Sequence, residues 1–218
     1  MTRQQVHEAI AILRREVPQW DVPVVSLMAQ EQRDPYRVLI ATLLSLRTLD
    51  QTTGPAAQRL FALADTPERM LQLEEQTIAQ AIYPVGFYRT KAAQILEIST
   101  RLLHEFGGRV PDDIDVLTSF NGVGRKTANL VLAEGYGIPA ICVDTHVHRI
   151  SNRWGYVKTK DPLGTEMALR KKLPRQYWIE YNPMLVALGQ HCCKPTSPLC
   201  SQCVVAQFCK RVGVQRSR

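Results

Sequence analysis

The 218-residue sequence lacks any long hydrophobic run. No apolar stretch approaches the roughly 18 residues that a membrane helix requires. Residues 1–17 mix charged side chains at helical spacing, whereas a secretory signal peptide would have an apolar core there. These absences exclude a membrane-spanning protein, and we expect a cytoplasmic protein with no membrane partner.

Alternation of apolar and polar residues with a period of two, the pattern of half-buried strands, is also lacking. Helix signals take its place. Asp34-Pro35 and Thr66-Pro67 each put a capping residue before a proline at the first helical position. Apolar residues spaced by three and four predict a further helix over 91–106, which ends at Gly107. We therefore predict an all-α fold.

Acidic residues are missing from the chain after Glu180, where only basic charges follow. Across the whole sequence 27 Lys and Arg residues face 20 acids, which makes a formal net charge of +7. Such a protein is attracted to polyanions, because neutralising phosphates releases their counterions. Many basic proteins bind no nucleic acid, so charge alone leaves both alternatives equally open.

Cysteine is almost absent outside the C-terminal stretch, which holds five of the six. In a cytoplasmic protein such a group favours metal ligation over disulfides. Gaps of six, two and five residues separate four of them, which can therefore surround one small inorganic centre. These four candidate ligands are Cys193, Cys200, Cys203 and Cys209. Zinc and iron–sulfur clusters both take four thiolates, so the residue types alone leave the two alternatives open.

Two glycines mark a tight turn between two helical patterns, in the run Gly122-Val123-Gly124. Glycine lets the backbone turn sharply and approach another molecule without a Cβ in the way. The free N–H groups at the start of the following helix suit a phosphate, and Arg125 adds a positive charge there. A purely structural turn between two helices explains the same residues equally well.

Lys126 follows this turn directly and falls in the first turn of the predicted helix. The positive end of the helix dipole disfavours a charged amine, and a neutral amine is the better nucleophile. The alternative is an ordinary solvated lysine that contacts a phosphate. The residue alone does not decide between them.

Four separated segments and the terminal cysteines together carry a resemblance over nearly the whole chain. Besides Gly122–Asn129, the segments are Leu43–Asp50, Gly86–Ala92 and Val143–Arg149. Asp144 stands eighteen positions after Lys126. In residue type and spacing the chain resembles the endonuclease III family of the helix-hairpin-helix Gly/Pro/Asp superfamily, which are DNA glycosylases with lyase activity acting on abasic sites.

The resemblance implies an enzyme that removes oxidised pyrimidines from duplex DNA and then nicks the strand by β-elimination. Lys126 would attack the anomeric carbon of the damaged nucleotide and form a Schiff base with the opened sugar. Asp144 would help to deprotonate the lysine and stabilise positive charge on the sugar. By itself Asp144 is also a favoured N-cap, and the two roles can coexist.

Reaching a base inside duplex DNA requires flipping it out, and side chains must fill the gap that it leaves. The resemblance assigns this to the positions of Arg47 and Phe87, although packing in the core is the alternative for Phe87. Arg47 departs from the family, which usually has glutamine there, and neighbouring Leu46 and Leu49 also differ. These departures put the lesion preference and opposite-base preference in doubt.

Three further residues match positions near the expected base pocket: Ser45, Asp50 and His146. Ser45 and His146 could equally be hydrogen-bonded structural residues. The resemblance also favours a 4Fe-4S cluster on the four cysteines over zinc, because all-cysteine zinc sites commonly use two Cys-x-x-Cys pairs. Cys192 is then a bystander and Cys142 a buried apolar residue. Lys194, beside the cluster, would contact DNA phosphate, with simple surface solvation as the alternative.

The domain organisation that the resemblance implies is a six-helix barrel over 28–138 and an iron–sulfur domain made of 1–27 and 139–218. The hairpin would lie at the cleft between them. We expect a monomer whose partner is damaged duplex DNA, associated with the nucleoid in a prokaryote. Two rivals are an adenine-specific glycosylase of the same superfamily and a non-catalytic DNA-binding module. The first family generally lacks the lysine, and Lys126 with Asp144 argues against the second.

Overall fold

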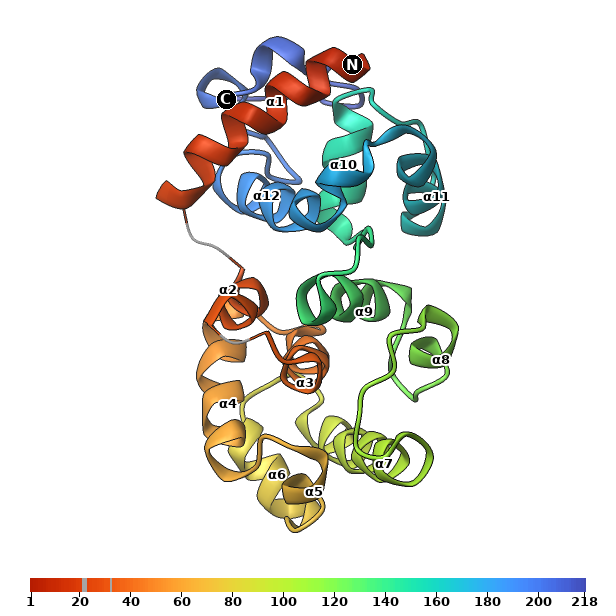
Figure 1. Ribbon diagram of the computed structural model, residues 1–218. Coiled ribbons are helices and arrows are strands. Elements are labelled where there is room, and N and C mark those ends of the chain that lie inside the picture. Colours follow the sequence, from red (N-terminus) through yellow and green to blue (C-terminus); the bar gives the residue numbers. More distant parts are fainter. Residues whose placement is uncertain (21–22, 32) are drawn as a thin grey trace. The chain divides into compact units, whose positions relative to one another are not determined.

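The computed structural model describes residues 1–20, 23–31 and 33–218, and it divides the chain into two units. The continuous unit is Val24–Ala140, and the discontinuous unit joins Met1–Pro23 to Ile141–Arg218. Helices occur throughout the described ranges, which contain no strand (Figure 1). The predicted all-α fold is confirmed.

Two helices of the continuous unit begin directly after a residue whose side chain caps the helix N-terminus. Asp34 accepts hydrogen bonds from the backbone N–H groups of Tyr36 and Arg37, at 2.8 and 3.1 Å, and Thr66 accepts one from Arg69. The helix predicted over 91–106 begins three residues earlier, at Tyr88. The elements are α2 (Val24–Glu31), α3 (Pro35–Ser45), α4 (Asp50–Leu63), α5 (Pro67–Met70), α6 (Glu75–Ile82), α7 (Tyr88–Phe106), α8 (Ile114–Thr118), α9 (Arg125–Leu130) and the π-helical η2 (Val131–Gly135).

Helix α3 is the centre of the continuous unit. It packs on α2, α4, α7, α9 and η2, and all its residues from Val38 to Leu44 are buried. A helix that is apolar on every side is stable only inside a core. Because α3 touches both α7 and α9, it fixes the helices that carry two of the segments singled out in the sequence.

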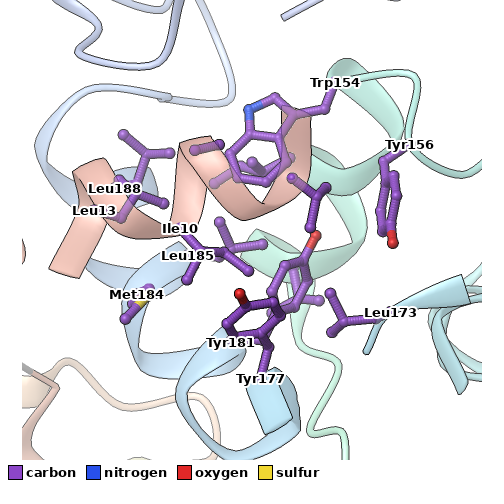
Figure 2. Packing of buried hydrophobic residues seen from close by; sticks show 14 of the residues in the cluster. Ile10, Leu13, Trp154, Tyr156, Leu173, Tyr177, Tyr181, Met184, Leu185 and Leu188 are labelled. Carbon is purple, nitrogen blue, oxygen red and sulfur yellow. The ribbon is translucent and has the colours of Figure 1, made fainter. Parts of the chain in front are cut away.

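The discontinuous unit combines the two ends of the chain. Its elements are α1 (Arg3–Glu16), η1 (Val17–Gln19), α10 (Thr145–Arg153), α11 (Pro162–Lys172), η3 (Arg175–Tyr177), α12 (Trp178–His191), η4 (Cys200–Gln202) and η5 (Ala206–Phe208). Figure 2 shows Ile10 and Leu13 of α1 in one core with Leu185 and Leu188 of α12 and with Trp154. The N-terminal helix therefore completes the core under the cysteine loop.

The division between the units lies at Pro23/Val24 and Ala140/Ile141, a few residues from the positions 27/28 and 138/139 that the sequence suggested. None of the described helices is both long and apolar enough to cross a bilayer.

Candidate active site

The glycine turn joins α8 to α9 as a helix–turn–helix hairpin. Gly122 has a φ of +80°, and a Cβ there would come within 2.7 Å of the Gln94 amide. Gly124 is the N-cap of α9, and the space around its missing Cβ is open. Val123 between them is buried and anchors the turn. The backbone beside Gly124 is therefore free to approach a ligand closely.

Lys126 is the second residue of α9 and is half-buried, as is Arg125 before it. Thr127, Ala128 and Asn129 on the same helix are buried and fix its orientation. The backbone of Lys126 is thus held in a rigid first helical turn, while its side chain is in partial contact with solvent. A nucleophile needs both a fixed backbone position and an accessible reactive group.

Asp144 is the N-cap of α10. Its Oδ1 accepts hydrogen bonds from the backbone N–H groups of His146 and Val147, at 2.9 and 2.8 Å, and its Oδ2 lies 2.8 Å from the His146 Nδ1. The Asp144 side chain is only 13% exposed. The capping role considered from the sequence is confirmed, and the carboxylate is held in one orientation by the partners that cap it.

The structure places Arg47 and Phe87 together. Both are exposed, and the Arg47 guanidinium carbon lies 5.5 Å from the centre of the Phe87 ring. Phe87 is 62% exposed, so the alternative of core packing for this residue is wrong. Leu49 and Tyr83 of the same unit are similarly exposed. The Phe87 ring is therefore accessible to another molecule.

The remaining pocket candidates lie in two places. Ser45 ends α3 and donates to the Thr42 carbonyl at 2.8 Å, and Asp50 is the first residue of α4. His146 belongs to α10, where it contacts Asp144. Ser45 and His146 thus have the structural hydrogen bonds considered as their alternative, while their contact with a flipped base stays a prediction.

One residue of this region was missed in the sequence. Lys91 is 5% exposed, and its amine donates to the carbonyls of Leu44 and Leu46, at 2.9 and 2.6 Å. Burial lowers the pKa of Lys91 to about 8. A signal for it was present, because Lys91 stands four residues before Ile95 and so falls on the apolar face of its helix.

The four candidate cluster ligands line one pocket of the discontinuous unit. An Arg153 N–H donates to the Cys193 Sγ at 3.3 Å, and the backbone N–H of Arg211 lies 3.3 Å from the Cys209 Sγ. Cys192 is buried and donates its thiol to the Leu199 carbonyl, and Cys142 is buried as predicted. N–H donors directed at sulfur fit deprotonated, metal-bound thiolates.

Four cysteines around a shared pocket supply the thiolate ligands that a single metal centre needs. Lys194 next to them is exposed, and its carbonyl accepts a hydrogen bond from Arg153 at 2.7 Å.

The structure thus brings together Arg47 with Phe87, Asp144 with His146, and the cysteines with one another. Lys126 belongs to the continuous unit and Asp144 to the discontinuous unit. Their cooperation stays a prediction.

Comparison with known proteins agrees with these features. The model of the HhH-GPD superfamily base excision DNA repair proteins matches residues 40–175. The model of the iron-sulfur binding domain of endonuclease III matches residues 193–209, which begin and end at Cys193 and Cys209. The cofactor is therefore an iron–sulfur cluster of the 4Fe-4S type, as predicted, and not zinc.

One relative and two solved structures match this chain over most of their own length. Endonuclease III of Thermotoga maritima is 47% identical over 83% of this chain and 84% of its own. A non-covalent endonuclease III–DNA complex matches with a TM-score of 0.84 and 32% identity, over 97% of this chain and 96% of that one. A trapped endonuclease III–DNA covalent intermediate matches with the same TM-score and identity, over 97% of both chains. The chain therefore belongs to the endonuclease III family and is a bifunctional DNA glycosylase and abasic-site lyase of base excision repair.

Proposed function

We propose that this enzyme excises oxidised pyrimidines from duplex DNA with Lys126 as its nucleophile. The neutral amine attacks C1′ of the damaged nucleotide, and the bond from C1′ to the base breaks with its electron pair leaving on the base. The sugar ring then opens and yields a Schiff base between Lys126 and C1′. Loss of a proton from C2′ breaks the C3′–O bond, which nicks the strand, and water finally releases the lysine.

The observation that carries this proposal is the place of Lys126 in the hairpin. Its helix begins at Gly124, where the open approach to the backbone suits a DNA phosphate at the helix N-terminus. A phosphate bound there would hold the sugar next to the second residue of α9. The similarity to a covalently trapped endonuclease III–DNA complex supports a covalent step in this chain as well.

Asp144 would assist through its carboxylate. Capping contacts and His146 hold this group in a single orientation, and its side chain is largely shielded from water. A fixed carboxylate in a water-poor site can accept a proton from the lysine ammonium, which frees the neutral amine for attack, and can stabilise positive charge on the sugar. We assign it both tasks.

Arg47 and Phe87 would enter the duplex where the damaged base leaves it. Their exposed side chains lie together, so that one cation and one aromatic ring present a single wedge. Ser45 and Asp50 flank the Arg47 loop, and His146 accompanies Asp144. We assign these three residues to the pocket of the flipped base.

The cluster would be held by Cys193, Cys200, Cys203 and Cys209. Bound there, the cluster would connect the C-terminal loop through iron–thiolate bonds to these cysteines. Lys194 beside Cys193 would then be held in place, and its exposed amine would contact a DNA phosphate. We further propose that the enzyme acts as a monomer and, since its net charge of +7 favours polyanions, associates with nucleoid DNA.

Trapping with borohydride tests the nucleophile directly. Duplex DNA with one thymine glycol is incubated with enzyme and borohydride, which reduces a Schiff base to a stable amine. We expect a covalent complex with the wild-type protein, and peptide mapping should find the adduct on Lys126. An adduct on another lysine, or base release without any trapping, would refute the proposal.

A further inference from the structure

Arg47 and Phe87 share an unusual backbone conformation. Their φ angles are +56° and +59°, in the left-handed region that side chains with a Cβ rarely occupy. Such residues persist only where the surrounding structure holds them, and they cluster at functional sites. The two exposed side chains therefore depend on contacts made by their buried neighbours.

Part of that support is direct contact between the two loops. The backbone N–H of Gly86 donates to the Thr48 Oγ1 at 3.1 Å. A Cβ on Gly86 would lie 2.8 Å from the carbonyl oxygen of Arg47, a backbone atom that cannot easily move aside. Only glycine permits this approach, so the Arg47 loop and the Phe87 loop form one paired structure.

Lys91 reaches the same paired loops from the first turn of α7. Its amine donates to the carbonyls of Leu44 and Leu46, and the Thr48 Oγ1 lies 3.5 Å away. An ammonium has three donors, and three oxygens surround this one. The contacts connect the helix that follows Phe87 to the backbone on both sides of Ser45.

The position of the Lys91 amine explains how a lysine can be buried here beside uncharged oxygens. A helix leaves its last four carbonyls without partners inside the helix. At the end of α3 the carbonyls of Thr42, Leu43 and Ser45 accept from nearby residues, and that of Leu44 accepts from Lys91. The negative end of the α3 dipole then stabilises the cation.

We infer that Lys91 is a positioning residue that clamps the Arg47 and Phe87 loops into the pair that enters DNA. The inference rests on the gap-filling role proposed above for those two side chains. The positions of Arg47 and Phe87 matter for base removal from duplex DNA, because misplacement of a group by about 1 Å can lower the rate of a catalysed step roughly a hundredfold. The Lys91 clamp leaves the amine chemistry of Lys126 unchanged.

A test replaces Lys91 by Met, which keeps the length of the side chain and removes its charge. We expect single-turnover release of thymine glycol from duplex DNA to fall about tenfold or more. The fluorescence rise of 2-aminopurine placed opposite the lesion, which reports insertion of the wedge, should also be lost. Trapping on a single-stranded oligonucleotide with an abasic site, where no gap exists, should stay within about twofold of wild type. Lys171→Met, which removes one exposed charge on α11, is the matched control.

A double-mutant cycle separates positioning from general destabilisation. If Lys91 acts through the wedge, Lys91→Met should have little further effect once Arg47→Ala and Phe87→Ala are both present. Equal effects in both backgrounds, or unchanged release and fluorescence in Lys91→Met, would overturn the inference. If the two alanine changes alone leave release from duplex DNA unaffected, the gap-filling proposal is wrong and the inference falls with it.

A second variant guards against misfolding of Lys91→Met. Thr48→Val removes the hydroxyl that both Gly86 and Lys91 contact and keeps the shape of the side chain. It should lower release from duplex DNA in the same direction, by about threefold, and again spare trapping on single-stranded DNA. An effect of Thr48→Val on the single-stranded substrate alone would contradict the inference.

Discussion

Lys91 and Lys126 both stand in the first turn of a helix that begins directly after a glycine-containing turn. Lys91 belongs to α7 behind Gly86-Phe87, and Lys126 belongs to α9 behind Gly122-Val123-Gly124. The first is 5% exposed with carbonyl partners, and the second is half-buried in contact with solvent. Two lysines close to the start of a helix, the fourth residue of α7 and the second residue of α9, thus have different surroundings.

The two lysines differ in burial because a different helix end lies next to each amine. The Lys91 amine meets the negative end of α3, where orphan carbonyls hold it as a donor. Lys126 stays at the positive end of its own helix, beside an open backbone that suits a phosphate. A lysine near the start of a helix can therefore be buried as an anchor or remain accessible to a ligand, and its neighbours in three dimensions decide which.

Removal of the Lys126 amine should have the largest effect on the enzyme. In Lys126→Gln we expect complete loss of borohydride trapping and of strand nicking, because the proposed mechanism forms the Schiff base on the Lys126 amine. Lys91→Met should still be trapped on single-stranded abasic DNA. The comparison fails if Lys126→Gln retains trapping, as measured by gel shift of the covalent complex.

We expect the next largest loss of activity from substitutions at Asp144. Its capping role and its proposed catalytic role can be separated by the choice of replacement. Asn is also a good N-cap, so Asp144→Asn should change the free energy of unfolding by less than about 1 kcal/mol. Removing the charge should lower base release about 10³-fold, measured under single-turnover conditions. Asp144→Ala should lose stability as well, by about 1 kcal/mol in urea unfolding. Full activity in Asp144→Asn would leave Asp144 with the capping role alone.

The buried amine should also be visible in the pH dependence of stability. Burial lowers the pKa of Lys91 to about 8 from its ordinary value of 10.5, so above pH 8 the folded enzyme loses a proton that the unfolded chain keeps. The free energy of unfolding should therefore rise with pH between these values, by up to about 3 kcal/mol, relative to Lys91→Met. Urea unfolding of both proteins from pH 7 to pH 10 measures this difference, and parallel curves would argue against a buried, shifted amine.

The smallest expected effect concerns Arg47, the departure from the family's usual glutamine. Arg47→Gln should change relative release rates over a panel of lesions and opposite bases by a few-fold, about 1 kcal/mol of discrimination, and leave trapping intact. The guanidinium stacked over Phe87 is lost in this variant, while the Lys91 clamp stays. An unchanged lesion profile would show that Arg47 plays no part in selecting the base.

Much of the fold could be predicted because its signals are local. Proline after a capping residue, as at Asp34 and Thr66, fixes where helices begin regardless of what they pack against. The spacing of the cysteines likewise predicted one inorganic centre. Lys91 was overlooked, although the spacing placed it on the apolar face of its helix, because lysine is usually a surface residue. Only the carbonyls at the end of α3 make its burial favourable.

Local sequence signals were enough to predict the all-α fold, the glycine turn before Lys126 and the four-cysteine loop, since each depends on residues close together in the chain. The exposure of Phe87 beside Arg47 and the burial of Lys91 against the carbonyls below their loops, in contrast, follow from how the helices pack in three dimensions. Those outcomes depend on contacts between residues about forty positions apart, which no local pattern specifies.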